Sequence, residues 1–439
     1  MLLAESPRHP MHVAGLQLFQ VPQDAGPQFA REYYEALRAC DQVQPLFRKH
    51  PATTPGGLNV GWSPASDIDL GYHVRHSALP GPGRVKELLE LTSRLHSGML
   101  DRQRPLWETH VIEGLNDGRF AVYTKIHHGL VDGIATINLL QGSLSADALD
   151  SEIRAPWAVP DSADDHGGAS SRLQTLARAI KSIPRLGAST ISLARSALFE
   201  QQLTLPFRAP STMLNVPIGG ARRCAAQSWP LQRIKDVKNA AGTTVNDVVL
   251  AMCAGALRAY LIDQNALPEK PLVAMVPVSL RTSDDAAGGN AVSAVLADLA
   301  TDIDDPGRRL AMISTRMRNS KAVLAQLPRP QAIALGMSLL SPVVLGGLTG
   351  ISVSPPPFNV TISNVPGARN PLYANGARLQ GTYPMSIAAN GQALNITLVG
   401  NGDSLDFGLV GCRRAVPHLQ RLLVHLETSL KDLERAVGL

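Results

Sequence analysis

Apolar and polar residues in the first third of the chain follow the periods of strands and helices in turn. The pattern favours strands over residues 13–19, 109–115 and 119–126, and helices over residues 29–40 and 85–100. Between the last two strands, Asn116-Asp117-Gly118 supply a turn that tolerates positive φ, which is typical of a hairpin. This part of the chain therefore predicts a mixed α/β domain.

The same mixture of patterns returns after residue 213. Residues 245–261 predict a helix with Thr243 or Thr244 as its N-cap, and residues 418–436 predict an amphipathic helix. Strands are predicted at residues 272–279, 291–299, 359–362, 394–398 and 405–410. We therefore expect an α/β fold with one domain at 1–145, a linker at 146–212 and a second domain at 213–439.

The expected linker carries an uneven charge. Residues 147–165 hold six carboxylates against Arg154 together with Pro, Gly and Ser, which is typical of a linker. Residues 172–208 hold six Arg or Lys against Glu200, with apolar residues between them, and predict one or two amphipathic helices interrupted at Pro184 and Gly187. Such a helix can pack between domains or lie on an anionic lipid surface, and both can hold if different faces serve each purpose.

Composition excludes several classes of protein. The 439 residues have a net charge of +5, but aromatic residues make up only 4%, which argues against a base-stacking surface for nucleic acid. The four cysteines lie far apart and form no CxxC pair, so neither a zinc ribbon nor a disulfide scaffold is expected. Residues 1–10 carry Glu5, Arg8 and His9 and predict no signal peptide. We therefore expect a cytoplasmic setting.

One long apolar segment requires a separate interpretation. Residues 334–351 carry no charge over eighteen positions, which is near the minimum for a membrane span of roughly 17–25 residues. The segment contains Pro342 and several glycines and runs into Pro355-Pro356-Pro357. These residues favour a broken segment that is buried or dips into an interface over a transmembrane helix.

One string of seven residues carries the candidate chemistry. His127-His128-Gly129-Leu130-Val131-Asp132-Gly133 follows the predicted strand at 119–126 and precedes an apolar run at 134–140 that predicts a helix. Adjacent strand residues point to opposite faces, so one histidine can face a cleft while the other packs behind it. The two rings cannot easily share a metal ion, and no further ligands stand at workable spacing, so no metal site is expected.

The better role for one of these histidines is that of a general base. Neutral imidazole, with a pKa near 6.5, can take a proton from an alcohol at neutral pH. Asp132 could cap the following helix or bind an arginine, and Gly129 and Gly133 allow close approach of a substrate or of backbone. The alternative is a core histidine pair beside an ordinary N-capping aspartate, which the full string at a strand-to-helix junction disfavours.

This string resembles the HHxxxDG signature of acyl-CoA-dependent acyltransferases related to chloramphenicol acetyltransferase and to peptide-synthetase condensation domains. Further motifs, in order, are similar to those of bacterial wax ester synthase/diacylglycerol acyltransferases: Arg104-Pro105-Leu106-Trp107-Glu108, Thr244-Val245-Asn246-Asp247-Val248-Val249, Val276-Pro277-Val278-Ser279-Leu280-Arg281 and Ile362-Ser363-Asn364-Val365-Pro366-Gly367. The resemblance runs from about Met11 to the C-terminus. Ala368 and Gly400-Asn401-Gly402 depart from the family pattern and affect local loop shape.

The resemblance implies two chloramphenicol acetyltransferase-like domains with a tunnel between them. It also implies transfer of a fatty acyl group from acyl-CoA to a long-chain alcohol or diacylglycerol. His128 would then be the base that deprotonates the acceptor hydroxyl, with His127 and Asp132 completing the motif and no covalent acyl-enzyme. Ser363 is expected to donate a hydrogen bond to the oxyanion, and its alternative role is that of a turn serine.

Further motif positions are expected at substrate sites: Gly133, Asn246, Asp247, Asn364 and Trp107. Capping is an equal alternative for Asn246 and Asp247, as is a core position for Trp107. Residues 251–256 and 334–351 could line an acyl channel, in which each buried CH₂ contributes roughly 0.8 kcal/mol. No cofactor is expected, because acyl-CoA is a co-substrate whose phosphates Arg and Lys near the tunnel mouth should help to bind.

Three other functions compete with this interpretation. A condensation-type acyltransferase would use carrier-protein thioesters, and a lipid-binding protein would need no His128. A nucleic-acid partner, suggested only by the positive charge, is disfavoured because that charge lies in one segment without aromatic residues. We expect a cytoplasmic enzyme that associates peripherally with membranes or lipid droplets; these motifs encode neither its acceptor preference nor its oligomeric state.

Overall fold

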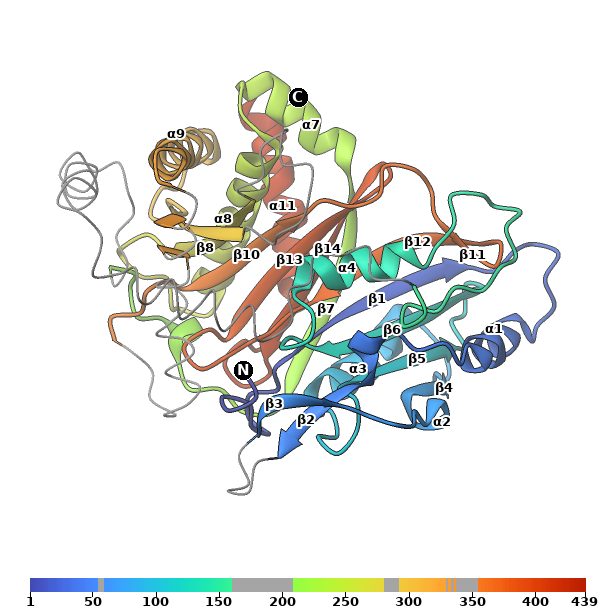
Figure 1. The fold of residues 1–439 in the computed structure, drawn as a ribbon. Coiled ribbons are helices and arrows are strands. Elements are labelled where there is room, and N and C mark those ends of the chain that lie inside the picture. Colours follow the sequence, from blue (N-terminus) through green and yellow to red (C-terminus); the bar gives the residue numbers. More distant parts are fainter. Residues whose placement is uncertain (54–58, 160–207, 280–291, 329–330, 333–334, 337–353) are drawn as a thin grey trace.

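The computed structural model describes residues 1–53, 59–159, 208–279, 292–328, 331–332, 335–336 and 354–439 (Figure 1). Two six-stranded mixed sheets with helices around them form the fold, so the expected α/β class is confirmed. The expected basic helices at 172–208 and the apolar segment at 334–351 lie almost entirely outside the described residues.

The first sheet has the strand order β11-β12-β1-β6-β5-β4. Its strands pair antiparallel except β4 and β5, and the expected hairpin is β5–β6, with Gly118 in the turn at a φ of +74°. The strand bounds are β1 (His12–Gln20), β4 (Val74–Ala78), β5 (Trp107–Glu113), β6 (Arg119–His127), β11 (Tyr373–Ala374) and β12 (Ala377–Met385). A separate pair joins β2 (Lys49–Thr53) to β3 (Asn59–Pro64).

Helices pack on both faces of the first sheet because its strands alternate apolar side chains between the faces. Phe120 and Val122 pack with Tyr33 of α1 (Phe29–Ala39) on one face, whereas Tyr123 packs with Leu88 of α3 (Val85–Ser97) on the other. The α3 face also meets the second sheet. The short helices of this half are η1 (Pro45–Arg48) and α2 (Leu70–His73).

The second sheet has the order β7-β14-β13-β10-β8-β9. Its strand bounds are β7 (Arg222–Pro230), β8 (Val273–Ser279), β9 (Val292–Asp298), β10 (Val360–Val365), β13 (Leu394–Asn401) and β14 (Ser404–Cys412). β10 lies parallel to both β8 and β13, and the remaining pairs are antiparallel.

Four helices gather on one side of the second sheet, at the top of Figure 1: α7 (Leu231–Ala241), α8 (Val245–Asp263), α9 (Pro306–Ala325) and α11 (Arg421–Ala436). A short helix, η3 (Met213–Asn215), precedes β7. At the contact of α8 with α11, a Cβ on Gly255 would lie 2.2 Å from Ser429 Oγ, so only glycine fits. This face holds the larger core.

α8 is the one described helix that is long and apolar enough to cross a membrane, and 72% of its apolar window is buried inside the protein. Residues 251–256, which were expected to line an acyl channel, are at most 1% exposed apart from Gly255, which is also buried. They pack in the core between the second sheet and the neighbouring helices. The structure therefore gives these residues a packing role.

The two sheets do not follow the order of the chain. β11 and β12 come from the expected second domain at 213–439, but β12 pairs with β1 from Ala14 to Gln20. A returning segment thus completes the first sheet. The domain boundaries at 145 and 213 remain predictions. Strands β11 and β12 follow residue 213 in the sequence but belong to the first sheet.

Candidate active site

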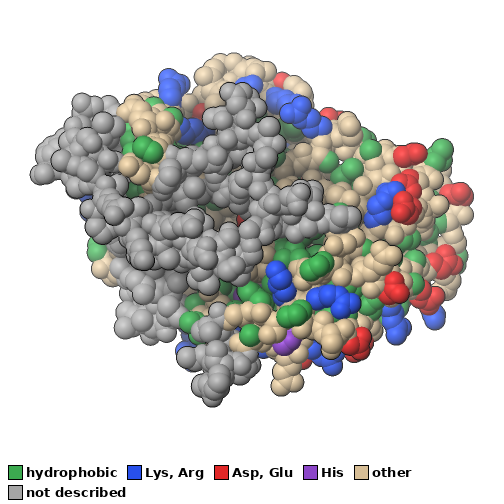
Figure 2. Space-filling model, in the orientation of Figure 1, with side chains coloured by type: hydrophobic (Ala, Val, Ile, Leu, Met, Phe, Trp, Pro, Cys, Tyr) green, Lys and Arg blue, Asp and Glu red, His purple; other side chains and the backbone are tan. Residues whose placement is uncertain are grey.

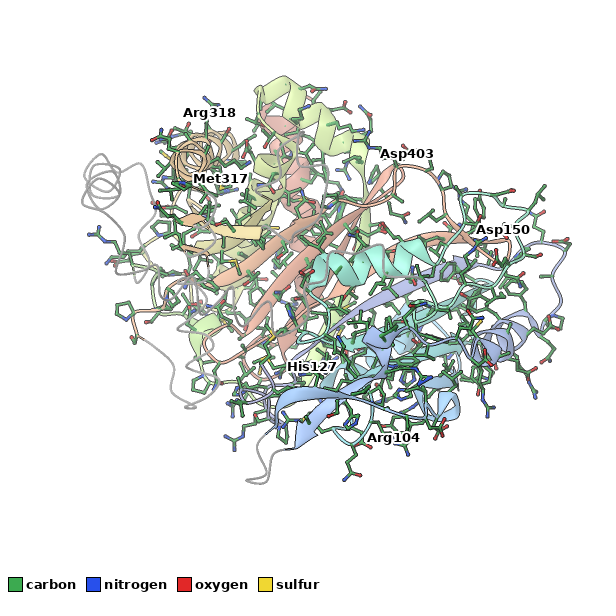
Figure 3. All side chains as sticks on the ribbon, viewed as in Figure 1. Arg104, His127, Asp150, Met317, Arg318 and Asp403 are labelled. Carbon is green, nitrogen blue, oxygen red and sulfur yellow. The ribbon has the colours of Figure 1, made fainter. Side chains whose placement is uncertain are left out.

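The two histidines of the seven-residue string occupy different environments. His127, labelled in Figure 3, is the last residue of β6 and is fully buried. His128 is half-buried. Backbone bonds fix both, because His127 N–H donates to Leu106 O at 2.9 Å and His128 N–H donates to Met11 O at 2.8 Å. The strand alternation predicted from the sequence therefore leaves His128 as the accessible imidazole.

The His127 ring is held by contacts on two sides. Its Nδ1 accepts the Gly129 N–H at 2.9 Å, so in the neutral ring the proton resides on Nε2. That Nε2 lies 3.6 Å from Glu5 Oε2. A Cβ on Gly129 would lie 2.9 Å from His127 Nδ1 and 3.0 Å from Trp62, so the close approach of this turn requires glycine.

Glu5 connects the N-terminal segment to this histidine. Its side chain is buried, and it accepts hydrogen bonds from the Met11 N–H at 3.0 Å and from Arg102 at 2.9 Å. Burial alone would raise the pKa of Glu5, but His127, Met11 and Arg102 outweigh it and hold the pKa below its ordinary value. Glu5 is therefore an ionised carboxylate behind the histidine motif.

A second layer of histidines lies beside His127. His12 on β1 is the strand partner of His127. The Nε2 of His12 forms a hydrogen bond with His96 O at 2.9 Å, and the rings of His12 and His96 meet edge to face. Burial first, and then His96 and Lys125, lower the pKa of His12 well below its ordinary value. Burial and Lys125 lower the pKa of His96 to about 3. Both rings are therefore neutral at physiological pH.

Asp132 begins the helix that follows the motif. Its carboxylate accepts the Ala135 N–H at 2.9 Å as N-cap of α4 (Gly133–Gly142), and its carbonyl accepts Thr136 Oγ1–H at 2.8 Å. The capping role expected for Asp132 is thus present. No described atom lies within 4 Å of a Cβ built on Gly133, so there is room beside the start of α4.

α4 joins the motif to the second sheet. Ile137 of α4 packs with Val365 of β10 and Val399 of β13 in one apolar cluster. Ser363 lies two residues before Val365 and so shares its face of the strand. Ser363 is half-buried, and its hydroxyl makes no side-chain hydrogen bond to any described residue. Asn364, also half-buried, points to the opposite face.

The paired motif at the start of α8 serves the helix itself. Asp247 forms a capping box with Thr244, and its Oδ2 also accepts the Ser314 hydroxyl of α9 at 3.2 Å. Asn246 in the same turn is half-buried. The capping alternative therefore accounts for Asp247, whereas a substrate contact by Asn246 remains a prediction.

Trp107 does not lie at a channel surface in this structure. It is fully buried, its indole N–H donates to Phe47 O at 2.8 Å, and its ring stacks on His73 and Trp157. Because its side chain is fully buried, Trp107 has no exposed surface with which to make the expected contact with a substrate. Trp107 instead begins β5, which pairs with β6 next to the motif.

Glu5 and Arg102 were not predicted as site residues from the sequence. Their contact joins positions 97 residues apart, and neither residue belongs to a periodic pattern. The available signal was that Arg102 stands just before the Arg104-Pro105-Leu106-Trp107-Glu108 motif. In the described ranges, no group of three or more His, Cys, Asp or Glu side chains is arranged to hold a metal ion.

These contacts define what the site can do. The half-buried imidazole of His128, whose backbone N–H is fixed by Met11 O, can accept a proton. Helix α4, capped by Asp132, runs from the motif to the face of β10 that carries the Ser363 hydroxyl. A partly buried imidazole and a hydroxyl that can donate a hydrogen bond are groups that suit acyl transfer to a hydroxyl acceptor. The fold and this site define an acyltransferase of the histidine-motif class.

Comparison with protein-family models supports this class. Residues 1–249 match the wax ester synthase/diacylglycerol acyltransferase catalytic domain, and residues 288–434 match the C-terminal domain of the same family. A Mycobacterium tuberculosis relative named as a probable diacylglycerol O-acyltransferase is 61% identical over 443 residues, covering 100% of this chain and 98% of its own. "O-acyltransferase WSD" from Acinetobacter baylyi is 40% identical over 446 residues, covering 100% and 96%.

Solved structures agree. A wax ester synthase/diacylglycerol acyltransferase from Marinobacter aquaeolei matches with a TM-score of 0.79 at 40% identity, covering 100% of this chain and 98% of that one. A condensation domain of the CDA synthetase matches in fold, with a TM-score of 0.56 at 17% identity, covering 98% and 92%. The chain belongs to the wax ester synthase/diacylglycerol acyltransferase family, and the expected family and acyltransferase activity are confirmed.

Proposed function

We propose that this protein moves a fatty acyl group from acyl-CoA to the hydroxyl of a long-chain alcohol or of diacylglycerol. The single observation that carries the proposal is the environment of His128, half-buried beside α4, which reaches the strand that bears Ser363. The family match and the names of the relatives support an alcohol or diacylglycerol as acceptor.

The reaction proceeds without a covalent acyl-enzyme. His128 accepts the proton of the acceptor hydroxyl while its oxygen attacks the thioester carbonyl, and a tetrahedral oxyanion forms. Ser363 donates a hydrogen bond to that oxyanion. When the carbon–sulfur bond breaks, the ester forms and the CoA thiolate takes the proton from the His128 imidazolium. Glu5 and His127 hold the motif in place and are positioning residues in this scheme.

Purified full-length protein with palmitoyl-CoA and either hexadecanol or diacylglycerol tests the proposal. We expect release of free CoA thiol matched by a wax ester or a triacylglycerol. Thiol release without a neutral lipid would indicate hydrolysis, and no product with either acceptor would overturn the proposal. Activity only with a carrier-protein thioester would favour a condensation-type acyltransferase of the same fold.

Ser363→Ala tests the oxyanion step. Loss of one oxyanion donor lowers kcat by about 10²–10³-fold in other enzymes, so a fall of that size with little change in KM is expected. Ser404→Ala, at the start of β14, is a matched control that should retain the activity. Equal kcat values for the two variants would remove Ser363 from the mechanism.

We also propose that the protein works at a membrane or lipid-droplet surface. The support is the charge of residues 172–208, six Arg or Lys against one Glu with apolar residues between them. Flotation with vesicles containing phosphatidylglycerol should recover the protein at low salt and release it at high salt. Failure to float at low salt would contradict this proposal.

A further inference from the structure

Helix α3, which packs on the first sheet, covers β7, the edge strand of the second sheet. We call this contact between the two sheet layers the seam, and we call the layers of the first and second sheet the first and second half. Ser93 Oγ accepts the Cys224 N–H at 2.9 Å, and Ser97 Oγ accepts the Arg222 N–H at 2.9 Å. These two hydroxyls take the place of a neighbouring strand and fix α3 against β7.

A strongly basic pocket opens along this seam. Its volume is about 490 Å³, and its wall includes Arg94 of α3, Arg222 and Arg223 of β7, and Arg413 just after β14. Glu90 is the one carboxylate in that wall. Two elements of the second half and one of the first therefore bring four guanidinium groups to one cavity.

These arginines lack the partners that other arginines of the protein have. Arg233, for comparison, is paired with Glu427 and Glu434 at 3.0 Å and 2.7 Å. Within the described ranges, none of the four pocket arginines forms an ion pair with a carboxylate. Their positive field is therefore available to a ligand.

Arg222 supplies a fixed charge in the wall of the pocket. Only 4% of it is exposed, and its guanidinium donates to three carbonyls, those of Gly219, Arg8 and Ala388. Burial lowers the pKa of Arg222, and the groups that partly offset this are the Cys412 and Cys224 thiols rather than a carboxylate. A buried guanidinium bonded only to neutral oxygens leaves its charge uncompensated.

Phosphate and diphosphate groups are the ligands that several convergent arginines recognise, because the planar guanidinium binds two oxygens at once. The pocket also lies toward the catalytic end of the first sheet. His96, next to Ser97, contacts His12 with a ring separation of 4.8 Å, and His12 is the strand partner of His127. A phosphorylated substrate bound here would lie on the far side of that histidine layer from α4.

We propose that the arginine pocket binds the phosphate groups of the acyl-CoA donor. This inference rests on the proposed function, which makes acyl-CoA the donor. A phospholipid headgroup offers the same chemistry, so the test must separate the two sources.

The experiment compares charge reversals in the full-length protein. Arg94→Glu and Arg413→Glu change exposed side chains of the pocket. Arg414→Glu is the matched control, because Arg414 is the exposed neighbour that donates to Pro217 O and does not line the pocket. KM and kcat for palmitoyl-CoA are measured for each variant, together with binding of CoA by calorimetry and binding of phosphatidylglycerol vesicles.

Each pocket variant should raise the KM for palmitoyl-CoA and the Kd for CoA by about tenfold or more, since a charge-assisted contact is lost and a repulsion is added. The value of kcat and the KM for the alcohol should change little, and Arg414→Glu should resemble the unmodified protein. Equal KM and Kd values in all variants of an active enzyme would overturn the inference alone. Loss of vesicle binding with an unchanged KM would overturn it in favour of a headgroup site.

An unmodified protein that neither binds CoA nor releases thiol would overturn the proposed donor and the inference together. The KM comparison therefore separates failure of the pocket assignment from failure of the proposed function.

Discussion

At the scale of single residues, the buried His127 fixes the position of the half-buried His128. His127 accepts the Gly129 N–H and lies 3.6 Å from Glu5, which Arg102 in turn binds. The motif is therefore supported by the ion pair between Glu5 and Arg102, neither of which belongs to the seven-residue string. We infer that the geometry of His128 depends on a carboxylate near the N-terminus.

Glu5→Gln tests this dependence. The substitution removes the anion from Arg102 and from His127, so the free energy of unfolding should fall by about 1.5–3 kcal/mol, the usual value for a hydrogen bond to a charged group. Because His127 and Arg102 hold the pKa of Glu5 low, its stabilisation is present at neutral pH and is lost only as the pH falls through that lowered pKa. Misplacement of the motif should lower kcat by up to about 10²-fold.

Urea unfolding and steady-state kinetics measure the two effects. Glu35→Gln is the control, because Glu35 pairs with Arg31 on the exposed face of α1 and its side chain is 59% exposed. That variant should change neither quantity appreciably. If Glu5→Gln behaved like Glu35→Gln, Glu5 would have no role in positioning the motif.

At the scale of elements, α3 is one of the connections between the first sheet and the second. Its Ser93 and Ser97 hydroxyls accept two N–H groups of β7, an edge strand that would otherwise present them unpaired. A helix of the first sheet's layer thus supplies acceptors for two N–H groups at the edge of the second sheet.

Ser93→Ala should destabilise the protein by about 1–3 kcal/mol, because it leaves the buried Cys224 N–H without an acceptor. Denaturant unfolding followed by tryptophan fluorescence measures this change. Ser66→Ala, in an exposed turn, should lie within about 0.5 kcal/mol of the unmodified protein. A small effect for Ser93→Ala would mean that water or another group replaces the hydroxyl.

Elements with a strong local pattern were predictable from sequence, and those defined by distant partners were not. The 119–126 strand and the helix at 245–261 correspond to β6 and α8, with Thr244 as the cap. β12 was not predicted, because Gly381 and Pro384 interrupt its pattern and its partner β1 lies about 365 positions earlier in the chain. α9 was also not predicted, because its sequence mixes arginines among its apolar residues.

The residues of the candidate site also divide into those that could be predicted from the sequence and those that could not. His128 and Asp132 could be found because one string holds both, and the alternation of a strand indicates which ring is accessible. Glu5 and Arg102 could not be found, because their contact depends on how the N-terminal segment folds back. Trp107 stands in a family motif, but it contributes packing rather than an exposed wall.

At the scale of the whole molecule, the two sheets meet where β12 crosses β14. A Cβ on Gly408 would lie 1.8 Å from Pro384 O, so this crossing requires glycine. Beside it, Asp406 of the second sheet is fully buried and accepts the Thr382 N–H of the first sheet at 2.7 Å. Elsewhere on the described surface, Figure 2 shows Lys and Arg interspersed with Asp and Glu over the lobe of the first sheet, as is usual for a solvated face.

Asp406 should make stability depend on pH. Burial raises its pKa to about 6, although Ser228, Thr382 and Asn401 partly oppose the shift. The folded state therefore holds the proton more tightly than the unfolded chain, and stability falls as the pH rises from about 4 to about 6. The difference of about two pKa units corresponds to about 3 kcal/mol.

Asp406→Asn should remove this dependence and raise the free energy of unfolding at pH 7 by up to about 3 kcal/mol, with little change at pH 4. Urea unfolding at a series of pH values measures it. Asp403→Asn is the control, since Asp403 lies exposed in the turn before β14 (Figure 3). Parallel pH profiles for Asp406→Asn and the unmodified protein would contradict the assignment.

The most direct test of the account is the rate of acyl transfer by His128→Ala, measured as palmitoyl-CoA consumption and ester formation with saturating acceptor. The control is His425→Ala, which removes a histidine that pairs with Asp263 on α8 rather than one in the motif. If His128 is the general base, its variant should lose about 10²–10⁴-fold in kcat while its unfolding transition stays close to that of the unmodified protein. A folded His128→Ala variant that forms ester at the unmodified rate would contradict the central claim.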